Sequence, residues 1–219
     1  MHRSLLAAAL ALATLPATLP AQIIVGGGGA APHQPPPTFY FSAWVGYGQN
    51  SIVDDGSSAS SWDFGSGPQY RATLEYALGS ESTLGVAGTY ARTPLRYTDT
   101  GETPGGCGDC DADATVQSLM ALFHLGGRPG FHQVIELGAG IRQYRDFKAR
   151  ATKLTLPPSN DTDFAFAVGY GVGYGLGGTS AIQLVQEYAS AIHQREGLPG
   201  NARSNSQQYV TRLGMRFGF

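Results

Sequence analysis

The stretch 163–175 constrains the fold of this chain more than any other, because large apolar residues alternate with small ones along it. Successive side chains of a β-strand point to opposite faces, whereas a helix would mix the two sets around its circumference. The pattern therefore predicts a strand with one bulky face and one face of Asp, Ala and Gly. The bulky residues are Phe164, Phe166, Val168, Tyr170, Val172 and Tyr174.

Seven other stretches repeat this two-residue period, and we expect strands at 39–47, 69–78, 83–90, 118–125, 135–142, 163–175, 182–189 and 209–219. Short connections at 79–82, 126–130 and 176–180 alternate with long polar ones at 49–67, 93–114, 146–162 and 192–206. Such alternation is typical of an antiparallel barrel with tight turns on one side of a membrane and loops on the other. The chain is thus predicted to be all-β, an eight-stranded antiparallel transmembrane up-and-down β-barrel.

Composition favours lipid over water as the medium around this barrel. Charged residues make up 14% of the 219 residues, against about 25% in typical soluble domains. The mean hydropathy is only −0.12, as expected when every second strand residue faces lipid. The architectural rival is a soluble lipocalin-like barrel, whose interior would be apolar and whose exterior would be charged. A net charge of −2 offers no basic surface, and we predict no nucleic-acid partner.

The first residues predict export from the cytoplasm. A positive start at Arg3, an Ala/Leu run over 5–15 and a small residue at Ala21 follow the order of a signal peptide, which we place at 1–21. A signal anchor is the alternative reading. Residues 22–38 are rich in Gly and Pro and are predicted to be a flexible segment, which leaves 39–219 for the barrel.

The last predicted strand completes a resemblance. It places Tyr209, Leu213, Met215, Phe217 and Phe219 on one face and ends in phenylalanine. Together with the export signal and the eight alternating stretches, the chain resembles the small eight-stranded bacterial outer-membrane barrels of the OmpA-like and OmpX-like superfamily over 39–219. The resemblance implies a Gram-negative outer-membrane location and contact with outer-membrane lipid and lipopolysaccharide. It also implies that the barrel-assembly machinery recognises this C-terminal motif during biogenesis.

Charged residues on the predicted lumen face should pair, because an isolated buried charge is costly. Glu187 and Arg212 both fall near the middle of neighbouring strands, and we predict an ion pair between them. An eight-stranded lumen is only wide enough for its own side chains, so these charges predict a structural plug. A conduction or proton path is the alternative. The predicted lumen charges are Arg71, Glu75, Glu136, Arg142, Glu187, Arg212 and Arg216, and His124 is a titratable residue that we group with them.

Cys107 and Cys110 have the spacing of a redox C-x-x-C motif, but they lie in a Gly-rich stretch without the helix that lowers a thiol pKa. We predict a local disulfide within the second long loop.

Asp109, Asp111 and Asp113 begin like a calcium-binding loop. That loop needs Gly at its sixth position and Glu at its twelfth, where Ala114 and Met120 stand instead. A solvated acidic loop is the favoured reading, and bridging of divalent ions to lipopolysaccharide is the alternative.

His193, Glu196 and Ser190 invite comparison with a hydrolase. Lipid A deacylases carry a His-x-Ser arrangement on a small barrel, but Gln194 and Arg195 follow His193 here, and that motif is absent.

No catalytic residue, metal site or cofactor is predicted. The sequence favours a non-enzymatic outer-membrane protein with a structural or surface-interaction role through four long extracellular loops and an unidentified extracellular ligand. A lipid-modifying barrel enzyme and a narrow channel for small apolar solutes are the alternatives.

Overall fold

The computed structural model describes residues 37–99, 104–127, 129–158, 160–177, 179–193 and 205–219. The predicted signal peptide at 1–21 and most of the segment 22–38 lie outside these ranges. No helix among the described residues has the length and apolarity needed to cross a bilayer. The strands are β1 (Phe39–Asn50), β2 (Ile52–Asp55), β3 (Ser60–Phe64), β4 (Gly67–Ala77), β5 (Ser82–Asp99), β6 (Asp109–Leu125), β7 (Gly130–Ala149), β8 (Asn160–Gly177), β9 (Ser180–Ile192) and β10 (Asn205–Gly218).

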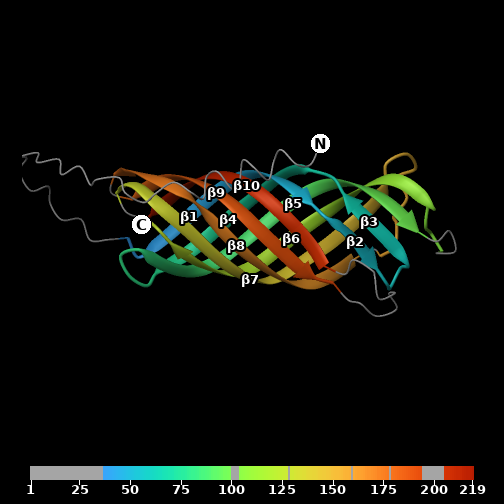
Figure 1. Ribbon diagram of the computed structural model, residues 1–219, viewed down its shortest axis with the longest axis horizontal. Coiled ribbons are helices and arrows are strands. Elements are labelled where there is room, and N and C mark those ends of the chain that lie inside the picture. The colour runs from blue at the N-terminus through green and yellow to red at the C-terminus, as the bar shows by residue number, and fades with distance from the viewer. Residues whose placement is uncertain (1–36, 100–103, 128, 159, 178, 194–204) are drawn as a thin grey trace, which may run out of the picture. The chain divides into compact units, whose positions relative to one another are not determined.

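Eight of these strands close into an antiparallel barrel, as Figure 1 shows. Neighbouring strands pair in the order β1, β4, β5, β6, β7, β8, β9 and β10, and β10 pairs again with β1, where Val45 lies opposite Leu213. Closure satisfies the backbone hydrogen bonds of every barrel strand within the barrel, as hydrocarbon requires. The predicted fold class is confirmed. We call the end with the short turns and Phe219 the turn end, and the opposite end the loop end.

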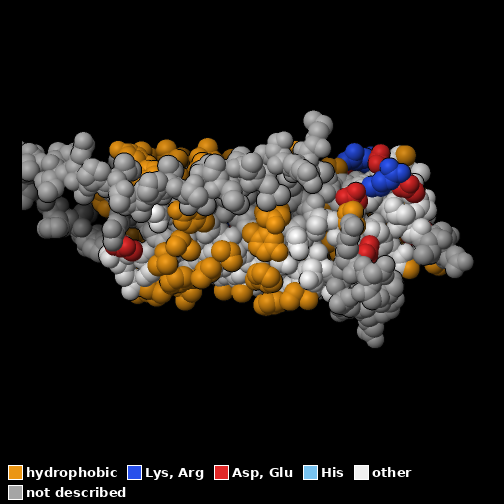
Figure 2. Space-filling model, viewed as in Figure 1, with side chains coloured by type: hydrophobic (Ala, Val, Ile, Leu, Met, Phe, Trp, Pro, Cys, Tyr) orange, Lys and Arg blue, Asp and Glu red, His pale blue; other side chains and the backbone are white. Residues whose placement is uncertain are grey.

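Large apolar side chains cover the outside of the barrel wall, as predicted. Leu137, Leu184 and Leu213 are 46%, 47% and 52% exposed, while their strand neighbours Glu136 and Arg212 are buried inside. Figure 2 shows apolar side chains over the middle of the wall and charged ones gathered at the loop end. We call this outward surface the apolar belt; it carries from each barrel strand in turn Val45, Leu74, Val86, Leu119, Leu137, Val168, Leu184 and Leu213.

Glycines on the inner face make room for large lumen side chains. A Cβ atom on Gly46 would lie 2.7 Å from Cγ of Arg212, closer than real side chains pack. The predicted role of the small strand face is therefore realised: absent side chains on one strand accommodate long ones from its neighbours.

The stretch 49–67, which we expected to be a long loop, instead contains the hairpin β2–β3. Strand β3 continues along β5 beyond the end of β4, with Trp62 opposite Tyr97. The turn of the hairpin is closed by the Asp55 carboxylate, which accepts hydrogen bonds from the backbone N–H groups of Ser57 and Ser58 at 3.2 and 2.9 Å. The loop prediction was wrong because Val53, Trp62 and Phe64 have an apolar core to enter.

The expected loops at 93–114 and 146–162 are also shorter than predicted. Strand β5 runs to Asp99, β6 begins at Asp109, and Leu95 pairs with Ala112 between them. Strand β7 runs to Ala149, and β8 begins at Asn160. Strand β9 ends at Ile192 and β10 begins at Asn205, and residues 194–204 of the fourth expected loop lie outside the described residues.

The loop end has an apolar core inside the barrel and polar side chains outside. Trp62 is fully buried, with its ring centroid 4.8 Å from that of Phe147 and 5.6 Å from that of Tyr144. This polarity is the reverse of that in the apolar belt, which is why the polar residues of 93–114 suggested a loop. The core consists of Val53, Trp62, Phe64, Leu95, Tyr97, Ala112, Ala114, Val116, Tyr144, Phe147, Ala149 and Leu156.

Candidate functional site

A ring of four charged side chains crosses the lumen at the level of the apolar belt. Arg71 of β4 lies 2.6 Å from Glu187 of β9 and 3.3 Å from Glu136 of β7, measured between guanidinium nitrogen and carboxylate oxygen. Arg212 of β10 lies 2.7 Å from Glu136 and 2.9 Å from Glu187. The predicted pair of Glu187 and Arg212 is therefore present as one side of a larger ring. Guanidinium and carboxylate groups alternate around it, so the two positive charges balance the two negative ones.

A second group lies closer to the turn end. Arg216 donates to the Glu75 carboxylate at 2.9 Å, and its guanidinium carbon lies 3.7 Å from the centroid of the Tyr40 ring. Glu75 also accepts hydrogen bonds from the hydroxyls of Thr73, at 2.7 Å, and Thr83. This carboxylate is satisfied on several sides although it is buried.

The remaining predicted lumen charge, Arg142, makes a different contact. It donates to the side-chain oxygen of Gln208 at 3.1 Å, and no ion pair of the described residues includes it. His124 lies 3.4 Å from Glu136 through Nδ1. The structure thus brings six of the seven predicted charges into ion pairs and places Arg142 apart.

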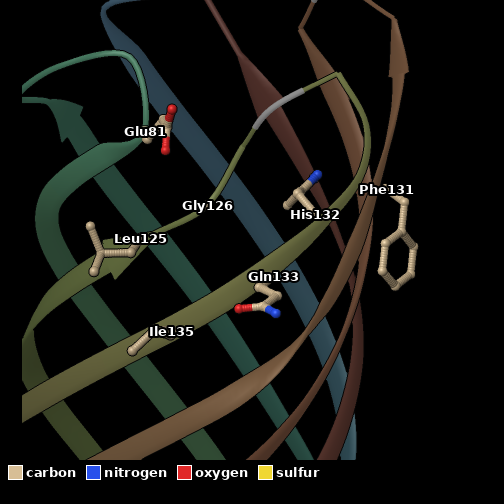
Figure 3. Close-up of a pocket in the computed structure, with 7 residues that line it drawn as sticks. All are labelled: Glu81, Leu125, Gly126, Phe131, His132, Gln133 and Ile135. Atoms are coloured by element: carbon tan, nitrogen blue, oxygen red, sulfur yellow. The ribbon is translucent and has the colours of Figure 1, made fainter. Parts of the chain in front are cut away.

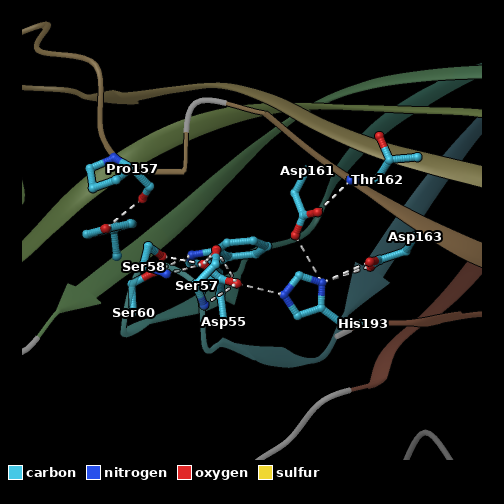
Figure 4. A network of polar contacts seen from close by, with 11 residues as sticks. Asp55, Ser57, Ser58, Ser60, Pro157, Asp161, Thr162, Asp163 and His193 are labelled. Carbon is cyan, nitrogen blue, oxygen red and sulfur yellow. Dashed lines mark hydrogen bonds and ion pairs between the residues drawn. The ribbon is translucent and has the colours of Figure 1, made fainter. Parts of the chain in front are cut away.

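A further cluster at the loop end was not anticipated from the sequence. His193 directly follows the last residue of β9, and its ring lies between aspartates from two other elements (Figure 4). Its Nδ1 is 2.9 Å from Oδ1 of Asp163 and 3.3 Å from Oδ2 of Asp161, both on β8. Its Nε2 is 3.1 Å from Oδ1 of Asp55 on β2. The side chains of His193 and Asp163 are 0% exposed, and that of Asp161 is 22% exposed.

Both ring nitrogens of His193 donate to carboxylates. Burial opposes the charged imidazolium, but hydrogen bonds to Asp163 and Asp55 and the charges of Asp163 and Asp161 outweigh it and raise the pKa of His193 to about 10. Burial likewise opposes the ionised form of Asp55, yet hydrogen bonds from His193, Ser58 and Ser57 hold its pKa well below the usual range. An imidazole with both nitrogens engaged has no free lone pair with which to take a proton from a nucleophile.

Ser190 does not join this cluster. It lies opposite Phe166 on the outward parity of β9, while the imidazole of His193 points into the barrel. The hydroxyl and the imidazole are therefore on opposite faces of the wall. Glu196, the third residue considered for a hydrolase, lies outside the described residues.

The members of the His193 cluster are visible in the sequence, but they lie in separate predicted elements. Asp163 belongs to the small face of its predicted strand, and Asp55 and Asp161 lie in stretches predicted to be loops. Asp163 and His193 lie on neighbouring strands, and Phe164 lies opposite Ile192. The rule that predicts the pair of Glu187 and Arg212 therefore predicts this pair too. Asp55 could not have been found this way, because the hairpin that carries it was not predicted.

The disulfide between Cys107 and Cys110 is formed, with a Cα–Cα distance of 6.0 Å. Both cysteines pack against the loop-end core. The carboxylate of Asp99 accepts hydrogen bonds from the backbone N–H groups of Cys107 and Gly108 at 2.9 and 3.2 Å. The predicted disulfide thus braces the start of β6 and the residues directly before it.

The acidic series in β6 points outward and pairs with arginines. Asp109 accepts from Nε of Arg96 at 2.8 Å, and Asp113 accepts from Nη2 of Arg150 at 2.7 Å. The one metal-compatible cluster among the described residues does not include this series. The expected acidic loop is therefore an ion-paired strand surface.

The predicted C-terminal motif lies on the lipid-facing side of β10. Tyr209, Leu213, Met215, Phe217 and Phe219 are all between 40% and 67% exposed. The backbone N–H of Phe219 donates to the carbonyl of Phe39 at 2.9 Å, so the last residue is fastened to the first barrel strand.

A pocket of about 380 Å³ opens at the turn end (Figure 3). Its titratable side chains are those of Glu81 and His132, and the His132 Nδ1 is 3.0 Å from the carbonyl of Gly130. The pocket is lined by Glu81, Leu125, Gly126, Phe131, His132, Gln133 and Ile135.

Comparison with known proteins agrees with this architecture. The family model described as outer membrane protein beta-barrel domain matches residues 5–217. No curated protein matches the chain. Among solved structures, the outer membrane protein OprG from Pseudomonas aeruginosa is similar with a TM-score of 0.54 and 13% identity over 84% of this chain and 96% of that one. Neisserial surface protein A gives 0.49 and 14% over 83% and 97%, and the outer membrane protease OmpT from Escherichia coli gives 0.41 and 8% over 82% and 97%.

Proposed function

Because the chain belongs to the outer membrane protein beta-barrel domain family, we propose that it is a non-enzymatic barrel with a closed lumen and a structural or surface-interaction role at its loop end. The family places the protein in the bacterial outer membrane. In such barrels the turn end faces the periplasm and the loop end faces outward.

The observation that carries this proposal is the ring of Arg71, Glu136, Glu187 and Arg212. Its side chains come from four strands, are at most 6% exposed and meet across a lumen that an eight-stranded wall leaves narrow. Opening a path for ions or solutes would separate these charges in a low-dielectric interior, and breaking such a pair costs several kcal/mol. The ring therefore favours a plug over the alternative of a channel for small apolar solutes.

The loop end supports the second half of the proposal. Strands β5 and β6 continue past the apolar belt with charged outward side chains, among them Arg92 and Arg96. Such a surface suits contact with lipopolysaccharide phosphates near the membrane and with an extracellular ligand farther out. For biogenesis we propose the barrel-assembly machinery as partner of the outward C-terminal motif.

The alternative of a lipid-modifying enzyme has weaker support. The imidazole of His193 is held by carboxylates at both nitrogens, and the hydroxyl of Ser190 faces the other side of the wall. A nucleophile and its base have to lie within hydrogen-bonding reach of each other.

Two measurements on purified, reconstituted protein test the proposal. In planar bilayers we expect the current to stay at the level of the protein-free membrane; steady, resolved conductance steps would refute the closed lumen. Incubation with labelled lipopolysaccharide should release no product. Product release that disappears in His193→Gln but persists in the matched variant His132→Gln would favour the enzyme instead.

A further inference from the structure

The carboxylates around His193 form their ion pairs with an imidazole, whereas those in the lumen ring pair with arginines. Among the described residues, the ion pairs of Asp55, Asp161 and Asp163 are all with His193, and Arg142, which stands opposite Asp163 on β7, donates instead to Gln208. Three carboxylates therefore share one imidazole as their ion-pair partner. A cation bound among these carboxylates would lower the cost of burying their charge.

We propose that Asp55, Asp161 and His193 bind a divalent transition-metal ion of the Zn²⁺ class. One ligand atom from each of these residues lies within 4.8 Å of the others. Donor atoms about 2.1 Å from a common tetrahedral zinc ion lie about 3.4 Å from each other. The 3.1 Å separation of His193 Nε2 and Asp55 Oδ1 is close to that spacing, and the metal ion would take the place of the proton that Nε2 otherwise donates to Asp55, and that proton leaves to solvent.

Asp163 orients the imidazole for this role. Its two carboxylate oxygens lie 2.9 and 3.1 Å from Nδ1, so it accepts that N–H and directs Nε2 toward Asp55. A carboxylate on the far nitrogen of a metal-binding histidine is a recurrent arrangement, because it fixes the tautomer and makes the imidazole a better donor. Asp163 is thus a positioning residue for the metal site.

The donor set indicates the class of ion. One imidazole nitrogen with two carboxylates suits Zn²⁺ and its divalent first-row neighbours, whereas Mg²⁺ and Ca²⁺ prefer all-oxygen ligands. Three protein ligands leave a fourth position for water. Asp161 is the most exposed member of the cluster, and the ion can enter along its side.

The bound ion would join three parts of the loop end. Asp55 ends β2 of the hairpin, Asp161 lies near the start of β8, and His193 follows β9. A ligand that binds only the folded state stabilises that state by mass action. The metal would therefore hold the β2–β3 hairpin in the mouth of the barrel, whatever the protein contacts at the cell surface.

The test is zinc binding by the full mature chain, folded in detergent without a histidine tag and stripped with a chelator. Titration calorimetry with ZnCl₂ should show one site per chain, with MgCl₂ and CaCl₂ giving at least about 100-fold weaker binding. His193→Gln should abolish the site, and Asp163→Asn should weaken it about 10- to 100-fold. The matched control is Asp63→Asn, an exposed aspartate of the same hairpin, which should bind like the unchanged protein.

Heat-dependent gel migration reports whether each variant is folded. If His193→Gln fails to fold, Asp161→Asn takes its place, because this side chain is partly exposed, and at least a 10-fold loss of affinity is expected from it. The proposal is overturned if zinc does not bind, if binding survives both of these substitutions, or if Mg²⁺ and Ca²⁺ bind as tightly as Zn²⁺. Zinc binding that fails only in variants of the cluster supports it.

Discussion

The apolar belt and the loop end are built from the same strands with opposite polarity. In β7, Leu137 and Ile141 face outward and Glu136 and Arg142 face inward, while farther along the strand the inward residues are Tyr144 and Phe147. The two-residue period holds through the belt and shifts by one residue at Arg145 and Asp146, which are both exposed, so the inward positions pass from Tyr144 to Phe147. The surrounding medium decides which parity is apolar, so the reversal marks the passage of these strands from hydrocarbon into water.

The two regions also owe their stability to different interactions. Inside the belt, buried charges must be balanced, because each is costly without its partner. Inside the loop end, aromatic and aliphatic side chains pack as in a soluble protein. The belt should therefore be destabilised most by substitutions that remove a charge partner, and the loop end by substitutions that remove buried side-chain volume.

The largest effect is expected inside the belt. Arg212→Met leaves Arg71 as the one arginine of the ring beside Glu136 and Glu187, and we expect the free energy of unfolding to fall by about 3–5 kcal/mol. Urea unfolding in lipid vesicles, followed by heat-dependent gel migration, measures it. The double variant Arg212→Met with Glu187→Gln should recover part of the loss; a double variant less stable than the single one would show that charge balance is not the cause.

A smaller, more local effect is expected in the loop-end core. Trp62→Ala removes a fully buried ring and should lower the stability of the loop end by about 3 kcal/mol. Hydrogen exchange should quicken in β2, in β3 and in the outer part of β5, while the belt portions of β8 and β9 stay protected. Equal acceleration in the belt would mean that the two regions unfold as one unit.

The same substitution on the two outer surfaces compares the media directly. Leu137→Arg puts a charge into the belt and should cost about 2–3 kcal/mol, whereas Thr98→Arg, on the exposed side of β5 at the loop end, should be nearly neutral. Urea titration in vesicles measures both variants. Similar losses would place both positions in the same medium.

The smallest effect is expected for the outward ion pairs. Arg96 and Asp109 are well exposed, with side chains 64% and 48% accessible, so water and salt screen their attraction. Arg96→Ala should leave the urea midpoint unchanged within error. A clear loss at low salt that vanishes at high salt would show that this pair contributes more than its exposure suggests.

The contrast between the two media also explains what could be predicted from the sequence. In the belt, the alternation of Phe164 to Tyr174 and the pairing of Glu187 with Arg212 followed from strand periodicity and neighbouring positions. At the loop end, apolar side chains face inward and polar ones outward, so the same rule predicts loops where the outer halves of β5 and β6 lie. The His193 cluster depends on contacts between distant segments, which periodicity does not encode.

The reversal of polarity along β5, β6 and β7 has a mechanical consequence. Sliding the barrel inward along its axis would draw Arg96 and Asp109 toward hydrocarbon, and sliding it outward would bring bulky side chains such as Phe164 into water. Inward displacement is opposed by the desolvation of charged side chains, and outward displacement by the exposure of apolar surface to water. The chain thus sets its own depth in the bilayer, and the mouth of the barrel stands at a fixed height above the lipid.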